Sequence, residues 1–156
     1  MSLQFYTGKN FWKSPSEYKP SEKVTKTKVK EIEKHLGVVL PIKYVSLMEE
    51  QNGGELSYRY VLFEDGDAAI VPYFHELEVE TGVGLSPVFV DEFGLPDGVV
   101  VITGDFHSWL ALDYREDKMD PKVIYITEDD SGNGTWQEHY LAKSFDEFTG
   151  RLFKKE

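Results

Sequence analysis

The sequence predicts one α+β domain: helices near the N-terminus, then an antiparallel sheet of about six strands, and a C-terminal helix packed on that sheet. Three observations predict this fold class. Apolar residues recur at helical spacing between residues 25 and 51, short segments after residue 55 alternate in hydrophobicity between turns, and a helical apolar pattern returns near residue 145. A chain of 156 residues can bury roughly two thirds of its unfolded surface as one domain.

Residues 1–22 are expected to form an irregular arm that precedes a single domain over residues 23–156. The arm is rich in aromatic residues, but their spacing fits neither a helix nor a strand, and Pro15 and Pro20 interrupt it. We expect the arm to pack across the core by its aromatic side chains. An arm that binds a partner protein is the alternative. The aromatic residues are Phe5, Tyr6, Phe11, Trp12 and Tyr18.

Two helices are predicted after the arm, one from residue 25 or 27 to residue 36 and one over about residues 42–51. Gly37 occupies the position at which a left-handed residue ends a helix. Pro41 suits the first position of the second helix, where its missing N–H would have no partner. Asn52-Gly53-Gly54 can supply the positive φ values that end this helix and turn the chain into a sheet.

The remaining elements are strands, a short helix and a final helix. The acidic turn 64–67 makes the first two strands a hairpin. The run 99–102 is continuously apolar and β-branched, so we expect both of its faces to be covered. Ser86 is predicted to cap a helix over residues 86–93, and Ser144 to cap the last helix in a capping box with Glu147. The extended segments are residues 56–63, 69–74, 77–79, 99–102, 109–114, 123–126 and 136–141.

Three short motifs resemble the SUKH superfamily, which includes fungal regulators of cell-wall synthesis and bacterial immunity proteins that neutralise secreted toxins. The first is Leu40-Pro41 with Tyr44, followed by Asn52-Gly53-Gly54. The second is Gly104-Asp105 followed by the strand 109–114, which ends Leu-Asp-Tyr, and the third is the segment 144–148, Ser-Phe-Asp-Glu-Phe. The resemblance extends from about Thr25 to Phe153 and implies a SUKH-like fold.

Charge is distributed unevenly along the chain, whose formal net charge is −11. Residues 1–36 contain eight lysines and four glutamates, a net charge of +4, whereas the remainder contains nine basic and 24 acidic residues. Such an acidic body disfavours nucleic acid, because phosphate binding requires clustered Lys and Arg. It would attract a basic protein and accelerate association. Solubility alone is the simpler explanation of the charge.

The resemblance implies a non-enzymatic protein-binding domain of the immunity type, whose partner is a basic toxin domain, often a nuclease. On this hypothesis the chain covers the toxin's active site with an acidic surface. A regulatory scaffold like the fungal relatives, and a small-molecule-binding domain or hydrolase, remain as alternatives. The oligomeric state is left open between monomer and homodimer.

Charge and position, and not the family motifs, select the candidate partner-binding residues. Acidic residues in turns combined with an aromatic anchor are typical of such surfaces. The candidates are Glu64, Asp65, Asp67, Glu128, Asp129, Asp130 and Trp136.

The spacing of residues gives little support to a metal site or a catalytic site. The four histidines have no metal-ligand spacing, and the segment 129–140 lacks the Glu that ends a calcium-binding loop, so no metal or cofactor is expected. His107 and Ser108 are adjacent on a strand and should point to opposite faces. Asp105 is expected to bond the backbone of its own turn. Asp113 is expected to pair with Arg59 or Arg115.

The sequence contains no apolar run long enough to span a membrane and does not open with a signal peptide. Cysteine is absent, which is compatible with a reducing compartment. We therefore expect a cytoplasmic protein without membrane contact.

Overall fold

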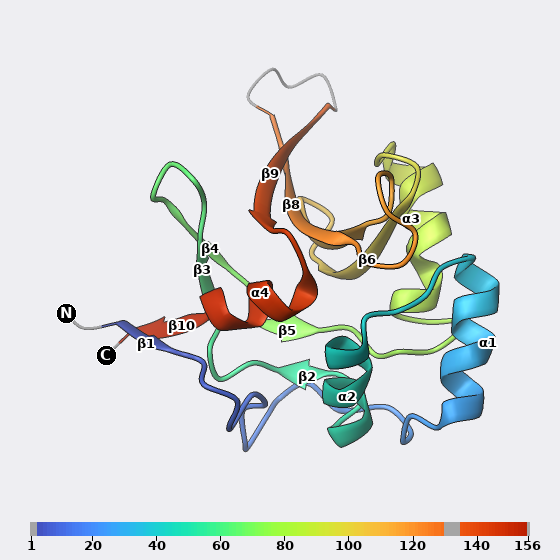
Figure 1. Cartoon of the computed structure of the whole chain (residues 1–156), viewed down its shortest axis with the longest axis horizontal. Coiled ribbons are helices and arrows are strands. Elements are labelled where there is room, and N and C mark those ends of the chain that lie inside the picture. Colours follow the sequence, from blue (N-terminus) through green and yellow to red (C-terminus); the bar gives the residue numbers. More distant parts are fainter. Residues whose placement is uncertain (1–2, 130–134, 156) are drawn as a thin grey trace.

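The computed structural model describes residues 3–129 and 135–155. Within this part of the chain, four helices and ten antiparallel strands confirm the predicted α+β class (Figure 1). No helix in the described ranges is both long and apolar enough to cross a bilayer. The helices are α1 (Lys26–Leu36), α2 (Ile42–Glu50), α3 (Ser86–Phe93) and α4 (Phe145–Arg151). The strands are β1 (Leu3–Phe5), β2 (Gly54–Glu55), β3 (Tyr60–Leu62), β4 (Ala68–Ile70), β5 (Tyr73–Phe74), β6 (Val99–Gly104), β7 (Ser108–Asp113), β8 (Lys122–Glu128), β9 (Trp136–Ala142) and β10 (Phe153–Lys155).

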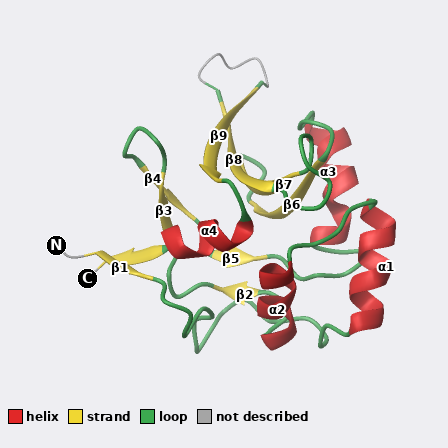
Figure 2. Cartoon of the chain, in the orientation of Figure 1, coloured by secondary structure: helices red, strands yellow, loops and turns green. Residues whose placement is uncertain are grey.

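The strands lie in three sheets rather than in one. Strands β6, β7, β8 and β9 form a meander in sequence order, and β2 pairs with β5 in a two-stranded ribbon. The third sheet has the order β1-β10-β3-β4, so it joins both chain ends to the first hairpin. In Figure 2 the meander lies beside α3, and the sheet with the chain ends lies on the opposite side of the molecule.

Two of the predicted strands are divided or lost, for reasons that lie in single residues. Pro72 interrupts the segment 69–74 because proline has no N–H for a ladder, and its carbonyl accepts a hydrogen bond from the Leu56 N–H instead (3.0 Å). The chain therefore changes sheets between β4 and β5. The predicted strand 77–79 does not form, because the Leu77 N–H donates to the Asn52 side chain (2.6 Å) and leaves an isolated bridge to Gly82.

The strands at the two chain ends were not predicted. β1 pairs with β10 through the register Gln4↔Lys154, and β10 joins β3 at Phe153↔Tyr60. Each terminal strand has three residues, which is too short for a periodic pattern to be recognised. Beyond β1, the arm runs along the main core, in which Tyr6 and Phe11 are buried.

Strands β6, β7 and β8 of the meander are covered on both faces, which confirms the prediction for residues 99–102. Val100 and Ile102 of β6 belong to the main hydrophobic core. Val99 and Val101 face the other way, into a second core between the meander and α3. All four side chains are buried. Because every strand alternates its side chains between faces, a sheet between two cores needs apolar residues at each position.

The helix ends explain most of the turn residues, with corrections. Pro41 is not the first residue of α2 but the residue before it, because its ψ of 138° is not helical and the helix begins at Ile42. Gly37 adopts φ 71° and its N–H donates to the Glu33 carbonyl (2.8 Å), and Ser144 Oγ accepts from the Glu147 N–H (3.1 Å), as predicted. The Glu147 carboxylate, which would complete the predicted capping box, bonds Arg151 instead (2.6 Å). Ser86 is not the cap of α3, because the helix begins at Ser86 itself. Its buried hydroxyl instead accepts from the Val101 N–H (2.8 Å), so it ties α3 to the edge strand β6.

Candidate functional site

Two acidic segments that the sequence singled out project from the same part of the molecule. Glu64, Asp65 and Asp67 are exposed in the turn between β3 and β4, and Glu128 is exposed at the end of β8. Figure 1 shows the β3–β4 hairpin and the β8–β9 hairpin rising from the upper part of the fold. Asp129 is half-buried beside Glu128, whereas Asp130 lies outside the described residues.

An aromatic contact joins these two hairpins. The Phe63 ring, next to the acidic turn, stacks on the His139 imidazole of β9, with 4.4 Å between ring centroids and 24° between planes. It also meets Tyr125 of β8 at 5.5 Å. Thr127 Oγ1 lies 3.0 Å from His139 Nε2 and holds that ring in place. The contact therefore packs the β3–β4 hairpin against the face of the β8–β9 hairpin that carries Tyr125 and His139. The acidic residues at the ends of these two hairpins are called here the acidic surface: Glu64, Asp65, Asp67, Glu128 and Asp129.

The acidic turn itself is held by its own backbone and one of its side chains. The Phe63 N–H donates to the Asp67 carbonyl (2.7 Å), which closes the loop. Asp65 Oδ1 accepts from the Asp67 N–H (2.9 Å). Asp65 therefore helps to shape the turn, while Glu64 and Asp67 extend their carboxylates into solvent.

The β6–β7 turn reaches the acidic surface through His107. Its Nδ1 lies 2.5 Å from Glu128 Oε1, and this hydrogen bond together with the charge of Glu128 raises the pKa of His107. Asp105 Oδ1 accepts from the backbone N–H groups of His107 (3.0 Å) and Ser108 (2.8 Å), as predicted for a turn aspartate. Burial works against ionisation of Asp105, but these hydrogen bonds prevail and lower its pKa.

Trp136 is opposite Glu128 in the β8–β9 ladder, but its indole is used inside the fold. The Nε1–H donates to the Phe93 carbonyl at the end of α3 (2.6 Å), and the ring packs edge-on against Trp109 at 6.3 Å. The side chain is half-buried in the second core. Its part in partner binding stays a prediction.

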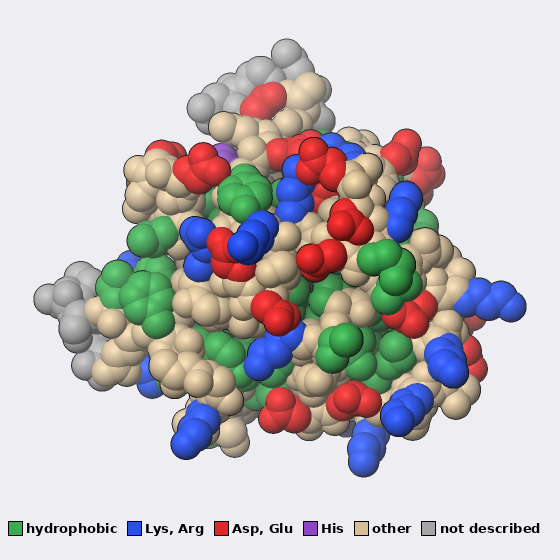
Figure 3. Space-filling view, viewed as in Figure 1, with side chains coloured by type: hydrophobic (Ala, Val, Ile, Leu, Met, Phe, Trp, Pro, Cys, Tyr) green, Lys and Arg blue, Asp and Glu red, His purple; other side chains and the backbone are tan. Residues whose placement is uncertain are grey.

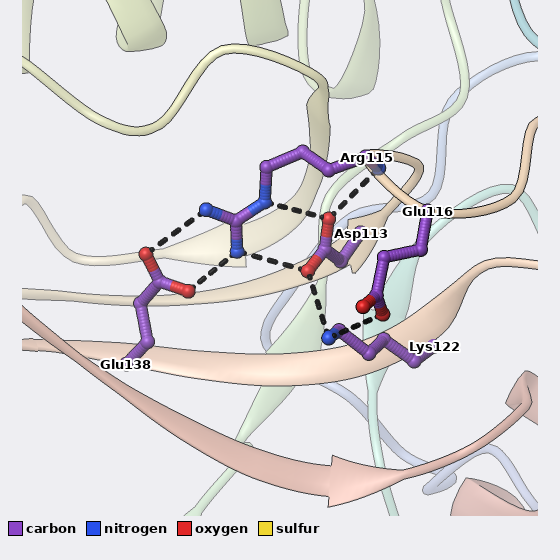
Figure 4. Close-up of polar contacts among 5 residues, drawn as sticks. All are labelled: Asp113, Arg115, Glu116, Lys122 and Glu138. Atoms are coloured by element: carbon purple, nitrogen blue, oxygen red, sulfur yellow. Dashed lines mark hydrogen bonds and ion pairs between the residues drawn. The ribbon is translucent and has the colours of Figure 1, made fainter.

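Asp113 is the last residue of β7 and belongs to a network of charged side chains that links β7, β8 and β9 (Figure 4). Its side chain is 1% exposed and binds Arg115 through two hydrogen bonds of 2.9 Å. The same guanidinium reaches Glu138 on β9, with 2.5 Å between Nη2 and Oε1. Lys122 Nζ lies 3.7 Å from Asp113 Oδ2. The aspartate of the Leu-Asp motif is thus engaged in structure.

Of the two arginines considered for Asp113, Arg115 is the partner. Arg59 pairs with Glu55 instead, at 3.5 Å. Burial alone would raise the pKa of Asp113, but the hydrogen bonds from Arg115 outweigh it and hold the pKa below its usual range. Asp113 therefore remains ionised in the folded protein.

The Asn-Gly-Gly motif is also structural. The Asn52 side chain is 2% exposed, donates to the Glu22 carbonyl (2.7 Å) and accepts from the Leu77 N–H (2.6 Å). Gly53 has φ 94°, and a Cβ there would lie 3.1 Å from the Glu76 backbone. The motif thus joins the end of α2 to the arm and to the segment after β5, in a turn too tight for larger residues.

The described residues assemble no metal-binding cluster of three or more His, Asp or Glu side chains. His107 and Ser108 do not form a nucleophile and base pair, because the imidazole contacts Glu128 while the Ser108 hydroxyl contacts Asp105 (3.1 Å) and Tyr125 (3.2 Å). This arrangement agrees with the predicted divergence of neighbouring side chains on a strand.

The sequence did not predict a pocket that is lined by aromatic rings and Glu76. It has a volume of about 250 Å³, and its walls come from the arm, β5, α3 and the β6–β7 turn. Its residues are separated widely along the chain, so no motif connects them. The one local signal was Phe106 in a turn that otherwise consists of small and polar residues.

The family comparison agrees with the three sequence motifs. Residues 26–149 match the family model SUKH_6, described as SMI1-KNR4 cell-wall. A search of the curated proteins finds no match to this chain. The matched segment contains Leu40-Pro41, Asn52-Gly53-Gly54, Gly104-Asp105 and the start of α4, and it covers well over half of the chain. The chain therefore belongs to the SUKH superfamily, within the SMI1-KNR4 group.

Proposed function

We propose that this protein is a non-enzymatic binding domain of the immunity type, which neutralises a basic toxin by covering its active site. The class of toxin that fits best is a nuclease, because a nuclease active site must attract phosphate and is therefore basic. We further propose that the protein acts in the cytoplasm and without a cofactor. A chain without cysteine suits that reducing compartment.

One observation carries the proposal: the Phe63–His139 contact packs the hairpin that bears the first acidic turn against the hairpin that bears the second. A partner large enough to span both hairpins would meet acids of both. On the face shown in Figure 3, acidic side chains are frequent over the upper part, with Lys or Arg side chains among them, and further Lys or Arg side chains project along the lower edge. The excess of acidic residues after residue 36 attracts a basic protein and raises the association rate.

Fewer observations support the other candidate functions. A regulatory scaffold like the fungal relatives would also bind proteins, and it shares the family match. It does not by itself require acidic residues at the ends of both hairpins. A small-molecule-binding domain would use an enclosed pocket with converging polar groups. The aromatic pocket is small for that purpose, at about 250 Å³, whereas the hollow of about 360 Å³ between α1, α3 and β6 is within the usual range and stays a candidate for a ligand.

The test is capture of the partner from the native source, followed by inhibition. The chain is immobilised and exposed to lysate at low and at high salt. We expect one basic protein with a toxin or nuclease domain to be retained at low salt and released as salt rises. The captured enzyme should lose its nuclease activity when the purified chain is added. Capture without inhibition would contradict neutralisation and favour the scaffold function, and an empty capture at low salt would contradict both.

A further inference from the structure

Six aromatic rings line the pocket that contains Glu76. They are Tyr18, Tyr73, His75, Phe89, Phe106 and Trp109. Tyr18 of the arm stacks on Tyr73 of β5 with 5.0 Å between centroids and 21° between planes. On the other wall, Phe106 stands edge-on to Phe89 (6.2 Å, 77°) and to Trp109 (5.8 Å, 84°). These ring contacts hold the two walls of the pocket in place.

Glu76 brings a negative charge into this aromatic pocket without a cationic partner. Its Oε1 accepts from the Tyr18 hydroxyl (2.6 Å), and the Thr81 side chain also bonds the carboxylate. None of the ion pairs within residues 3–129 and 135–155 involves Glu76. The nearby Glu78, by contrast, pairs with Lys28 at 2.9 Å.

The pKa shifts of Glu76 and His75 leave the Glu76 carboxylate negatively charged near pH 7. Burial raises the pKa of Glu76, but the hydrogen bonds from Tyr18 and Thr81 outweigh it, so the pKa lies below its usual value. Burial lowers the pKa of the neighbouring His75, so its imidazole is neutral near pH 7 and does not balance the carboxylate. Hydrogen bonds thus stabilise the half-buried carboxylate of Glu76, but no cation among the described residues pairs with it, so its charge can still attract one.

Phe106 adds a second, independent observation. It lies in the β6–β7 turn with φ 74°, a left-handed conformation that bulky side chains rarely adopt. Gly, Asn or Asp would suit this position at lower conformational cost. The ring is 54% exposed, so burial of Phe106 offsets little of that cost. Strain of this kind is concentrated at binding sites, where the surrounding structure holds the residue in place.

The size of the pocket limits the occupant to one side chain. Its volume of about 250 Å³ is below the ~300–1,000 Å³ of typical small-molecule sites. A carboxylate beside aromatic faces selects a cation, through both Coulomb attraction and cation–π contact. A guanidinium fits better than an ammonium, because it is planar, stacks on rings and carries less tightly held water.

We propose that the pocket between Tyr18, Glu76, Phe106 and Trp109 receives an arginine side chain of the basic protein partner. The guanidinium bonds the Glu76 carboxylate and lies against the aromatic rings. The pocket then acts as a specific anchor, while the acidic surface supplies long-range attraction. The identity of the partner as a protein rests on the proposed function, whereas the preference of the pocket for a guanidinium does not.

The probe is N-acetyl-arginine methylamide, with the citrulline analogue as its neutral isostere. The amide signals of Gly82 and Gly104 and the indole N–H of Trp109 are followed by NMR in the labelled full chain. We expect saturable shifts at these positions with a dissociation constant in the millimolar range, and no saturable shifts with the citrulline analogue. Equal responses to both compounds, or no response at these positions, would overturn the inference.

Two variants locate the binding, each with a matched control. E76Q removes the charge, and its control E80Q removes an equal charge from an exposed neighbour that does not line the pocket. F106N removes the ring but suits the left-handed turn, and its control V88A trims an exposed apolar residue of α3. Each pocket variant should weaken arginine binding about three- to thirtyfold, and each control less than about twofold. Unchanged binding in either pocket variant overturns the proposal.

The captured partner separates this inference from the proposed function. If a basic toxin is captured and E76Q and F106N bind it as tightly as the wild type, the arginine anchor is wrong and the proposed function stands. If the blocked arginine binds in the pocket but no basic protein is captured, the preference of the pocket stands and the proposed function fails.

Discussion

Asp113 and Arg115 are joined by two parallel hydrogen bonds, from Nε to Oδ1 and from Nη2 to Oδ2, each 2.9 Å long. The Arg115 N–H donates to the same carboxylate at 3.0 Å. The pair therefore fixes the turn after β7 and, through Glu138, attaches it to β9. A bidentate pair with one buried member is stronger than an exposed ion pair, because geometry and reduced solvation both favour it.

Replacing Asp113 with Asn should destabilise the fold. The carboxylate side chain is 1% exposed, and its loss leaves three donors of Arg115 with weaker partners. We expect the free energy of unfolding to fall by about 2–3 kcal/mol in urea denaturation. The control is E138Q, whose side chain is 38% exposed and should cost about 1 kcal/mol or less. Equal losses in the two variants would contradict the central role of Asp113.

Asp113 should also contribute to acid sensitivity. Its pKa in the folded protein is below the unfolded value, so the unfolded chain binds the proton more readily. Its contribution is therefore present above about pH 4 and is lost as pH falls through the folded pKa. The difference in unfolding free energy between wild type and D113N should shrink between about pH 5 and pH 2.5. A difference that is independent of pH would refute this assignment.

His107 should titrate above the ordinary histidine value, because Glu128 bonds and stabilises its charged form. A raised pKa contributes stability below about pH 6.5 that is lost as pH rises through the folded pKa. NMR titration should show the pKa of His107 moving down toward ~6.5 in E128Q. His75 serves as the internal control, since burial lowers its pKa and Glu128 does not contribute to that shift. No downward movement would mean that the contact is not formed in solution.

Asn52 should be among the costliest polar residues to remove. Its side chain bonds the arm at Glu22 and the Leu77 N–H, and both contacts are lost in N52A. The Leu77 N–H would then be buried without its partner, so we expect a loss of about 2–3 kcal/mol in urea denaturation. Q137A on the exposed face of β9 should change stability by less than about 0.5 kcal/mol. A small effect of N52A would show that water replaces the side chain.

Charge reversal in the β3–β4 turn should slow association with the basic partner. E64K/D67K changes two exposed acids and spares Asp65, which shapes the turn. We expect the association rate to fall about tenfold at low salt, with a flatter dependence on ionic strength and a similar dissociation rate. E49K/E50K on α2 alters the net charge equally and should have a smaller effect. Equal effects of both variants would mean that the net charge of the protein, and not the acidic surface, determines the association rate.

Local sequence rules predicted the elements whose stabilising contacts are local. Gly37 and Ser144 act within one helical turn, and Asp105 bonds residues two and three positions ahead. The β6–β7 hairpin and the double coverage of β6 followed from a turn signal and an apolar run. The capping role assigned to Ser86 was wrong, because a strand 15 residues away offered its hydroxyl a buried N–H.

The candidate site was predicted in part. The two acidic turns are recognisable from composition, but their union depends on Phe63 meeting His139 across two sheets. Trp136 was selected as an aromatic residue beside an acidic loop. The sequence alone does not reveal that its indole N–H donates to the Phe93 carbonyl. The aromatic pocket was missed because its walls come from segments without a shared motif.

The sequence by itself determined the family, the α+β class, the helices with most of their ends and the acidic character of the chain. The tertiary structure decided which strands share a sheet, how the chain ends pair and which acids lack a cationic partner. The physical reason is range: propensity, capping and turn chemistry act over a few residues, whereas Tyr18 bonds Glu76 across 58 positions. Such contacts form only when the whole core has brought their segments together, and in this protein they create the pocket.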